Sequence, residues 1–168
     1  MECLIFSDAH GKASLMERVL RAQPTAPSAI FFLGDGLRDS RFPVFERQTL
    51  YAVKGNCDGG LFGGLLPYDE EFVVSLEGHR ILAVHGHRFG VKSGLGGLIS
   101  YAASIDADIV LFGHTHLPSE QTLPAGTVVG GRALARPMYL FNPGSLAEGS
   151  FGTLLMRGET VLFSHGSV

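Results

Sequence analysis

Side chains that can bind metal ions are concentrated in five short polar segments of the sequence. Each segment directly follows a short apolar run, of the kind that forms a buried strand. In an open α/β sheet, ligands bind at the carboxyl ends of the strands, so this placement brings the segments to one edge. The shared placement predicts one metal site. The segments are Asp8-Ala9-His10, Gly34-Asp35, Gly55-Asn56, His85-Gly86-His87 and Gly113-His114-Thr115-His116.

The residue types in these segments suit transition metals. Carboxylate oxygen from Asp8 and imidazole nitrogen from His10 suit manganese, iron or zinc better than calcium or magnesium. Asp35 has two oxygens and could bridge two cations, while Asn56 could add a neutral oxygen ligand. Taken singly, each of these residues is also what an ordinary turn contains, so the structural interpretation stays open for each alone.

Two pairs of histidines are harder to explain as structure. His85 with His87, and His114 with His116, hold four of the seven histidines, each pair in a three-residue turn after an apolar run. Two dications with two carboxylates and a hydroxide would leave the site positively charged, which favours an anionic substrate such as a phosphate ester. We interpret His79, in a predicted hairpin turn, and His165, in the C-terminal tail, as structural.

The composition limits the class of protein. A chain of 168 residues, nearly half of them apolar, can form one domain with its own core, and we expect a single domain over 1–168. The net charge of −3 gives no basic field for nucleic acid or a membrane surface. No apolar run approaches the roughly 20 residues that span a bilayer. Two cysteines and an N-terminus without a basic region predict a cytoplasmic protein.

The pattern of apolar residues predicts the elements that would position the polar segments. A helix is expected over 12–23, followed by strands near 30–33 and 51–53, with a short helix over 44–49 between them. This βαβ-like opening predicts a largely parallel first sheet. Residues 59–67 read as a glycine-rich loop or short helix beside the site, and a helix is expected over 98–105.

Hairpins and short strands are predicted in the rest of the chain. Strands over 72–76 and 80–84 would be joined by Glu77-Gly78-His79. From residue 121 onward, short strands predict a second sheet packed on the first. These strands are expected over 127–129, 138–141, 151–156 and 160–164, with a hairpin turn at 157–159.

Taken in order, the polar segments resemble the motifs of the calcineurin-like metallophosphoesterase superfamily, and within it the small phosphodiesterases of the YfcE type. Asn142-Pro143-Gly144-Ser145 completes the match, which spans residues 4 to 145. The resemblance implies an α/β fold, a four-layer sandwich of two mixed β-sheets flanked by helices. It also implies two divalent metal ions, with manganese expected and iron, nickel or zinc as alternatives. Asp8, His10, Asp35 and His116 would hold one metal, and Asp35, Asn56, His85 and His114 the other.

The activity implied by the resemblance is metal-dependent hydrolysis of phosphodiesters, in which a hydroxide bridging the metals attacks phosphorus. We expect His87 to line the site and Asp58 to hydrogen-bond behind the ligands. Cys57 stands where many members of the superfamily carry a histidine that protonates the leaving group. A thiol is a poorer acid, so we expect a preference for good leaving groups, or His87 as the acid instead. A small packing residue is the structural alternative for Cys57.

Other functions and partners stay open at this point. A phosphomonoesterase or nucleotidase of the same superfamily would carry the same motifs. A non-catalytic interaction scaffold is a further alternative, as in the retromer subunit that resembles these enzymes, although such scaffolds have lost part of the ligand set. A small phosphate ester is the expected substrate, and a homo-oligomer is an open alternative. Arg132 and Arg136 could contact substrate phosphate or a second subunit, or lie in solvent, and residues 142–145 read as a structural turn.

Overall fold

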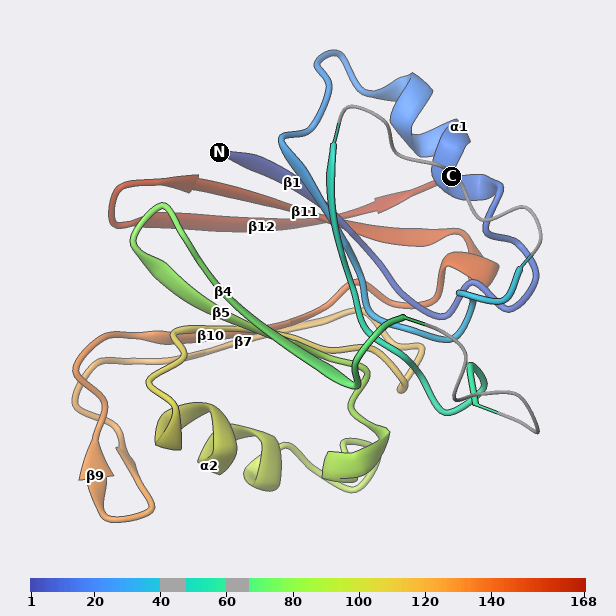
Figure 1. Ribbon diagram of the computed structural model, residues 1–168. Helices are drawn as coiled ribbons and strands as arrows, with labels where there is room; N and C mark the ends of the chain where they lie inside the picture. The colour runs from blue at the N-terminus through green and yellow to red at the C-terminus, as the bar shows by residue number, and fades with distance from the viewer. Residues whose placement is uncertain (40–47, 60–66) are drawn as a thin grey trace.

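The protein has four layers, with two β-sheets packed face to face and a helix on the outer face of each sheet (Figure 1). The computed structural model describes residues 1–39, 48–59 and 67–168. Helix α1 (Leu15–Ala22) covers one sheet, and helix α2 (Gly96–Ser104) covers the other. This arrangement confirms the four-layer α/β sandwich.

The first sheet has the strand order β12-β11-β1-β2-β3. Strands β1 (Glu2–Phe6), β2 (Ala29–Phe32) and β3 (Thr49–Ala52) run parallel to one another, as the βαβ-like opening predicts. Strand β11 (Ser150–Arg157) pairs antiparallel with β1, and β12 (Thr160–Ser167) pairs antiparallel with β11. The first strand of the chain therefore lies at the centre of its sheet, beside one of the last.

The second sheet has the order β4-β5-β6-β10-β7. Its three central strands are parallel and consist of β5 (His79–Val84), β6 (Ile109–Leu111) and β10 (Met138–Asn142). The outer strands β4 (Glu71–Leu76) and β7 (Ser119–Leu123) run antiparallel to their neighbours. Both sheets are thus mixed, and each has a parallel part whose carboxyl ends can carry a site.

The apolar runs are continuous because both faces of the central strands are buried. In β1, Cys3 and Ile5 point into the core between the sheets, while Leu4 and Phe6 pack under α1. In β5, Ile81 belongs to the core between the sheets and Leu82 packs under α2. Because side chains alternate along each strand, the central strands contribute to three apolar cores, one between the sheets, one under α1 and one under α2.

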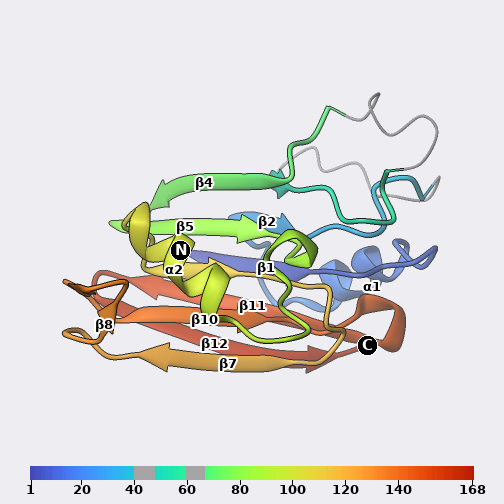
Figure 2. The same ribbon diagram turned by 90° about the horizontal axis from the view of Figure 1, so that it is seen from below.

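Smaller elements complete the chain. Strands β8 (Val128–Val129) and β9 (Arg132–Ala133) form a short hairpin, which Figure 2 shows beside α2 at one end of the molecule. Two 3-10 turns, η2 (His87–Phe89) and η3 (Leu146–Glu148), follow β5 and β10. No helix in the described part of the chain is both long enough and apolar enough to cross a membrane.

The predicted grouping of the late strands into one second sheet is wrong. Strands β11 and β12 join the first sheet, whereas β7 and β10 join β5 and β6 in the second. The pairing of β1 with β11 brings Glu2 opposite Leu155. Local sequence patterns do not report a contact over such a separation, which explains the error.

Several predicted boundaries shift in the structure. The first helix begins at Leu15, because tight turns occupy the preceding residues, with Lys12 N bonded to Ala9 O. The hairpin turn consists of Glu77 and Gly78, both with positive φ, so His79 is the first residue of β5. His165 lies in β12 and not in a tail. In the predicted 44–49 helix and 59–67 loop, residues 44–47 and 60–66 lie outside the described residues, and Thr49 begins β3.

Candidate metal centre

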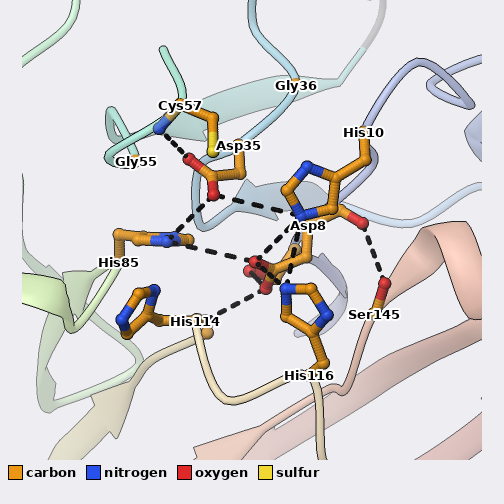
Figure 3. A network of polar contacts seen from close by, with 12 residues as sticks. Asp8, His10, Asp35, Gly36, Gly55, Cys57, His85, His114, His116 and Ser145 are labelled. Atoms are coloured by element: carbon orange, nitrogen blue, oxygen red, sulfur yellow. Dashed lines mark hydrogen bonds and ion pairs between the residues drawn. The ribbon is translucent and has the colours of Figure 1, made fainter. Parts of the chain in front are cut away.

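The five polar segments converge at one end of the sandwich, as the close-up in Figure 3 shows. Those with Asp8, Asp35 and Asn56 follow β1, β2 and β3 of the first sheet. Those with His85 and His114 follow β5 and β6 of the second sheet. The expected single sheet edge is therefore replaced by two edges that face each other, and each sheet supplies part of the cluster.

The backbone is strained where the candidate ligands lie. Seven of the described non-glycine residues have positive φ, and five of these are candidate ligands. Left-handed backbone is unfavourable for residues with a Cβ and persists where the surroundings impose it, often at functional sites. The five are Asp8 (54°), His10 (40°), Asp35 (60°), His114 (66°) and His116 (63°).

Two glycines allow the segments to approach one another closely. A Cβ at Gly113 would overlap Ser7 Oγ and crowd Asp8 Oδ2, and a Cβ at Gly55 would overlap Asp35 Oδ1. These positions therefore need glycine for space, because the carboxylates lie directly against the neighbouring loops.

Asp8 has one satisfied and one unsatisfied oxygen. Its side chain is buried, and Oδ2 accepts hydrogen bonds from Ser7 Oγ at 2.5 Å and from His114 N at 3.0 Å. Oδ1 has no hydrogen-bond partner among residues 1–39, 48–59 and 67–168, although His116 Nε2 lies 3.2 Å away. A buried carboxylate oxygen without a partner is unfavourable, and a cation would supply the missing interaction.

A first group of converging ligand atoms contains Asp8, His10 and His116, all within 4.8 Å of one another. The Nε2 atoms of His10 and His116 lie 3.3 Å apart, and His10 Nε2 is 3.7 Å from Asp8 Oδ1. Two imidazole nitrogens and one carboxylate oxygen facing a common point form a donor set typical of manganese, iron or zinc.

A second group contains Asp8, Asp35 and His85. His85 is fully buried, and its Nδ1 donates to Leu33 O at 2.7 Å, since a carbonyl oxygen can only accept. That bond directs Nε2 toward Asp35 Oδ2 at 3.4 Å and Asn56 Oδ1 at 3.1 Å. A backbone carbonyl that holds the far nitrogen of an imidazole is the usual support of a metal-binding histidine.

Asp35 belongs to the second group and also faces His10 of the first. Its Oδ1 accepts from Cys57 N at 2.7 Å, while Oδ2 is 3.4 Å from His85 Nε2 and 4.0 Å from His10 Nε2. Burial raises the pKa of Asp35, but the hydrogen bond and charge of His85 and the Cys57 N–H outweigh it and hold the pKa well below its usual range. Burial lowers the pKa of His85, yet Asp35 and Asp8 raise it overall.

Asp58 joins the loops that follow β2 and β3. Its Oδ2 accepts from Asp35 N at 2.7 Å and Gly55 N at 2.9 Å, and Oδ1 accepts from Gly36 N and Leu37 N, each at 2.9 Å. The side chain is buried beneath these loops. The structure thus places Asp58 behind the candidate ligands, where it fixes the backbone of Asp35.

His114 and His87 lie at the side of His85. The His114 ring centroid is 5.0 Å from that of His85, but no nitrogen of His114 belongs to the tight groups of ligand atoms found among the described residues. The ring centroid of His87 is 5.4 Å from that of His85, and the buried Nδ1 of His87 has no hydrogen-bond partner within the described chain. Burial and the charge of His85 lower the pKa of both histidines. A cavity of about 270 Å³ beside His87 is also lined by Glu70 and Tyr101.

The sulfur of Cys57 lies near candidate ligands from other segments of the chain. The residue is exposed, so the alternative of a small packing residue is wrong. Its sulfur forms a third group of converging ligand atoms with His10 and Asp35, which the sequence reasoning missed. Partial burial, together with the hydrogen bond to Asp35 and its charge, raises the pKa of the Cys57 thiol to about 11.

The Asn142–Ser145 segment supports the centre from the second sheet. Asn142 Nδ2 donates to Gly113 O at 2.9 Å and to Thr115 Oγ1 at 3.0 Å. Ser145 Oγ donates to Asp8 O at 3.0 Å. The segment is therefore a turn whose side chains hold two ligand loops, and only the family motif could have indicated this role.

Arg132 and Arg136 do not lie at the cluster. They line a cavity with Gly78, Asp108 and Met138, which mark the opposite ends of β5, β6 and β10. At that position the two arginines cannot contact a substrate phosphate bound at the candidate centre.

A sequence profile of the calcineurin-like phosphoesterase superfamily domain matches residues 1–166. The phosphodiesterase YfcE of Escherichia coli (strain K12) is 31% identical over 171 aligned positions, which cover 88% of this chain and 80% of YfcE. The relationship thus extends over most of both chains.

Solved structures share the fold. A predicted phosphoesterase from Streptococcus pneumoniae superposes with a TM-score of 0.74 at 25% identity, covering 99% of this chain and 88% of that protein. Vps29 of Entamoeba histolytica, solved with zinc, gives a TM-score of 0.69 at 19% identity and covers 99% of both chains. At that identity the second match concerns the fold alone.

Proposed function

We propose that this chain, which belongs to the calcineurin-like phosphoesterase superfamily, is a phosphodiesterase that uses two divalent metal ions. The observation that carries the proposal is the position of Asp35, whose Oδ2 faces His10 on one side and His85 on the other. An ionised carboxylate between two groups of nitrogen ligands suits a residue that bridges two cations.

The proposed ligand sets follow the two sides of Asp35. The free oxygen of Asp8, with His10 and His116, would hold one ion, and His85, Asn56 and His114 would hold the other. Manganese is the proposed metal, with iron, nickel and zinc compatible with the same donors. When bound, such a pair of ions lowers the pKa of a coordinated water and stabilises negative charge on a phosphoryl group.

The residues around the proposed ions hold the ligands in position and determine which groups could donate a proton to the leaving group. Asp58 and Ser145 fix the loops of Asp35 and Asp8, so the ligands need little rearrangement. Neither Cys57, with a thiol pKa of about 11, nor His87, with a lowered pKa, is a strong proton donor at neutral pH. We therefore infer that the enzyme prefers esters whose leaving groups depart without protonation.

Two alternatives share the fold. Both are compatible with it because a fold alone does not determine function. A phosphomonoesterase would use the same metal ligands, whereas an interaction scaffold would not need them. The YfcE relationship supports the diesterase over the monoesterase, and the retained candidate ligands support an enzyme over a scaffold. The proposal includes the cytoplasmic location expected from the sequence and a small phosphate ester as substrate.

The test is hydrolysis of bis(p-nitrophenyl) phosphate by chelator-stripped protein, with and without added Mn²⁺, beside p-nitrophenyl phosphate as the matched monoester. We expect Mn²⁺ to restore turnover, with higher kcat/KM for the diester. Higher kcat/KM for the monoester would replace the diesterase with a phosphomonoesterase. Absence of turnover of both esters with manganese, iron, nickel and zinc would leave the scaffold.

Substitution of Cys57 by His tests the inference about the leaving group. A histidine beside Asp35 can donate a proton at neutral pH, so we expect Cys57→His to raise turnover of a diester with a poor leaving group by about 100-fold. Turnover of bis(p-nitrophenyl) phosphate should change far less, because p-nitrophenolate departs without a proton. Equal rates for the variant and the natural protein on the poor substrate would show that Cys57 does not limit catalysis.

A further inference from the structure

A second cavity, of about 530 Å³, lies at the end of the second sheet away from the candidate metal centre. It is lined by the last turn of α2, the residues between α2 and β6, the starts of β5 and β10, and the β8–β9 hairpin, which extends beside α2 in Figure 1. A volume of this size falls within the range of small-molecule sites. The metal-centre residues His85, His114 and Asn142 lie at or beyond the far ends of β5, β6 and β10.

The walls of this cavity combine apolar and charged groups. Val129, Leu134 and Met138 supply apolar surface, and Leu134 packs against the core beneath α2. The charged residues are three cations and two anions, so the lining has an excess of positive charge. They are Arg80, Arg132, Arg136, Asp106 and Asp108.

Arg80 is the cation whose charge is available. Arg132 is paired with Asp106 at 2.9 Å, and Arg136 donates to Gly78 O at 2.9 Å. The guanidinium of Arg80, in contrast, has no hydrogen bond or ion pair within the described part of the chain, and only its backbone N–H is bonded, to Asp108 Oδ1. An uncommitted arginine on the wall of a partly apolar cavity is a ready contact for an anion.

Two carbonyl groups in the last turn of α2, beside this cavity, are already hydrogen-bonded. Ala102 O accepts from Ala107 N at 2.9 Å, and Ala103 O accepts from Asp106 N at 3.2 Å. These bonds satisfy acceptors of the last turn of α2, which would otherwise favour a cation.

We propose that this cavity binds a small organic anion, with its apolar body against Val129, Leu134 and Met138 and its charged group against Arg80. The site is separate from the candidate metal centre, so its ligand does not compete with a phosphate ester there. The Arg132–Asp106 pair joins the hairpin to the turn after α2, and both side chains are largely exposed. Such a pair contributes little in water, so the hairpin can separate from α2 to admit the ligand.

The test uses 1-anilinonaphthalene-8-sulfonate as the anionic probe and N-phenyl-1-naphthylamine as its uncharged counterpart. The zinc-supplemented protein is titrated with each probe, and binding is measured from the fluorescence of the probe and from changes in the amide chemical shifts of the protein. We expect the sulfonate to shift amides within 78–80, 103–108 and 129–136, and to bind more tightly than the uncharged probe. Arg80→Gln should weaken sulfonate binding about 10-fold, as expected for loss of a hydrogen bond to a charged group. The matched control, Arg18→Gln on exposed α1, should leave binding unchanged.

Three results would overturn the proposal. They are shifts confined to the metal-centre loops, equal affinity for the charged and uncharged probes, and unchanged affinity in Arg80→Gln. None of these readouts uses phosphoesterase activity. A protein without phosphodiesterase activity can still bind the probe here, and an active enzyme can fail to do so.

Discussion

In the described part of the chain, a cluster of aspartate and histidine lies at each end of the second sheet, and the two differ in how their buried polar atoms are satisfied. In the cluster of His79 and Asp108, Asp108 Oδ2 lies 2.8 Å from His79 Nδ1, and Oδ1 accepts from Arg80 N at 2.7 Å. His79 Nε2 faces Gly158 O at 3.0 Å. In the other cluster, Asp8 Oδ1 is buried without a hydrogen-bond partner in the described chain.

This difference separates a structural cluster from a candidate functional one more clearly than residue type does. The His79–Asp108 pair satisfies its atoms within the protein and links the second sheet to the hairpin between β11 and β12 of the first. The metal-centre cluster directs nitrogen and oxygen atoms toward common points, and two buried atoms in or beside it, Asp8 Oδ1 and His87 Nδ1, have no partner in the described chain. Buried polar atoms without partners therefore indicate where an added ion belongs.

The largest effect is expected from Asp35→Asn. This variant keeps the shape of the side chain but removes the charge shared between the two ligand groups, so we expect bis(p-nitrophenyl) phosphate turnover to fall by about 10²–10³-fold. Metal content, measured by mass spectrometry, should fall for both ions. Exposed Asp69→Asn is the matched control and should retain both properties. Near-normal metal content in Asp35→Asn would argue against the bridging role.

At the other cluster, Asp108→Ala should act on stability and not on chemistry. It leaves His79 and Arg80 N without their acceptor in a buried setting, so we expect the free energy of unfolding to fall by about 3 kcal/mol. Urea denaturation measures this change, and turnover per folded molecule should stay near that of the natural protein. A loss of turnover in the folded variant would mean that the two clusters are not functionally distinct.

An intermediate effect is expected from Asp58→Asn. Its carboxylate accepts four backbone N–H groups, and an amide in its place has only one oxygen to offer them. Loss of this support should weaken metal affinity by about 10–100-fold, measured by competition with a chelator. If affinity is unchanged while stability falls, Asp58 belongs with Asp108 as a structural residue.

The smallest effect is expected from Asp106→Asn. The ion pair of Asp106 with Arg132 is largely exposed, and asparagine tolerates the positive φ of 57° at this position. We expect the free energy of unfolding to change by no more than about 0.5 kcal/mol. If Asp106→Asn lowered the free energy of unfolding as much as Asp108→Ala, burial and satisfied hydrogen bonds would not explain why Asp108 is expected to matter more than Asp106.

The sequence was sufficient to predict the family, the four-layer fold and which side chains gather at one end, because that information lies in short local motifs. Asp8, Asp35 and His85 come shortly after the ends of β1, β2 and β5, so the end of each strand fixes their place. Their roles as metal ligands stay predictions.

Contacts between distant segments could not be predicted in the same way. The bond from Ser145 to Asp8, the approach of Cys57 to His10 and the pairing of β1 with β11 join residues far apart in the chain. The cavity beneath the β8–β9 hairpin was missed for the same reason, since its walls come from three separate stretches, 78–80, 100–108 and 129–138. Local periodicity contains no record of which strand edges meet.

The pairing of β1 with β11 has a consequence for the order in which the molecule can fold. Met156 O accepts from Met1 N at 2.7 Å, so the first sheet forms only when segments 155 residues apart meet. During synthesis, β1 keeps one edge unpaired until β11, over residues 150–157, has left the ribosome. Contacts of such high order make folding slow. Asp8, held by Ser145 from the segment before β11, acquires its final surroundings only after that segment has been made.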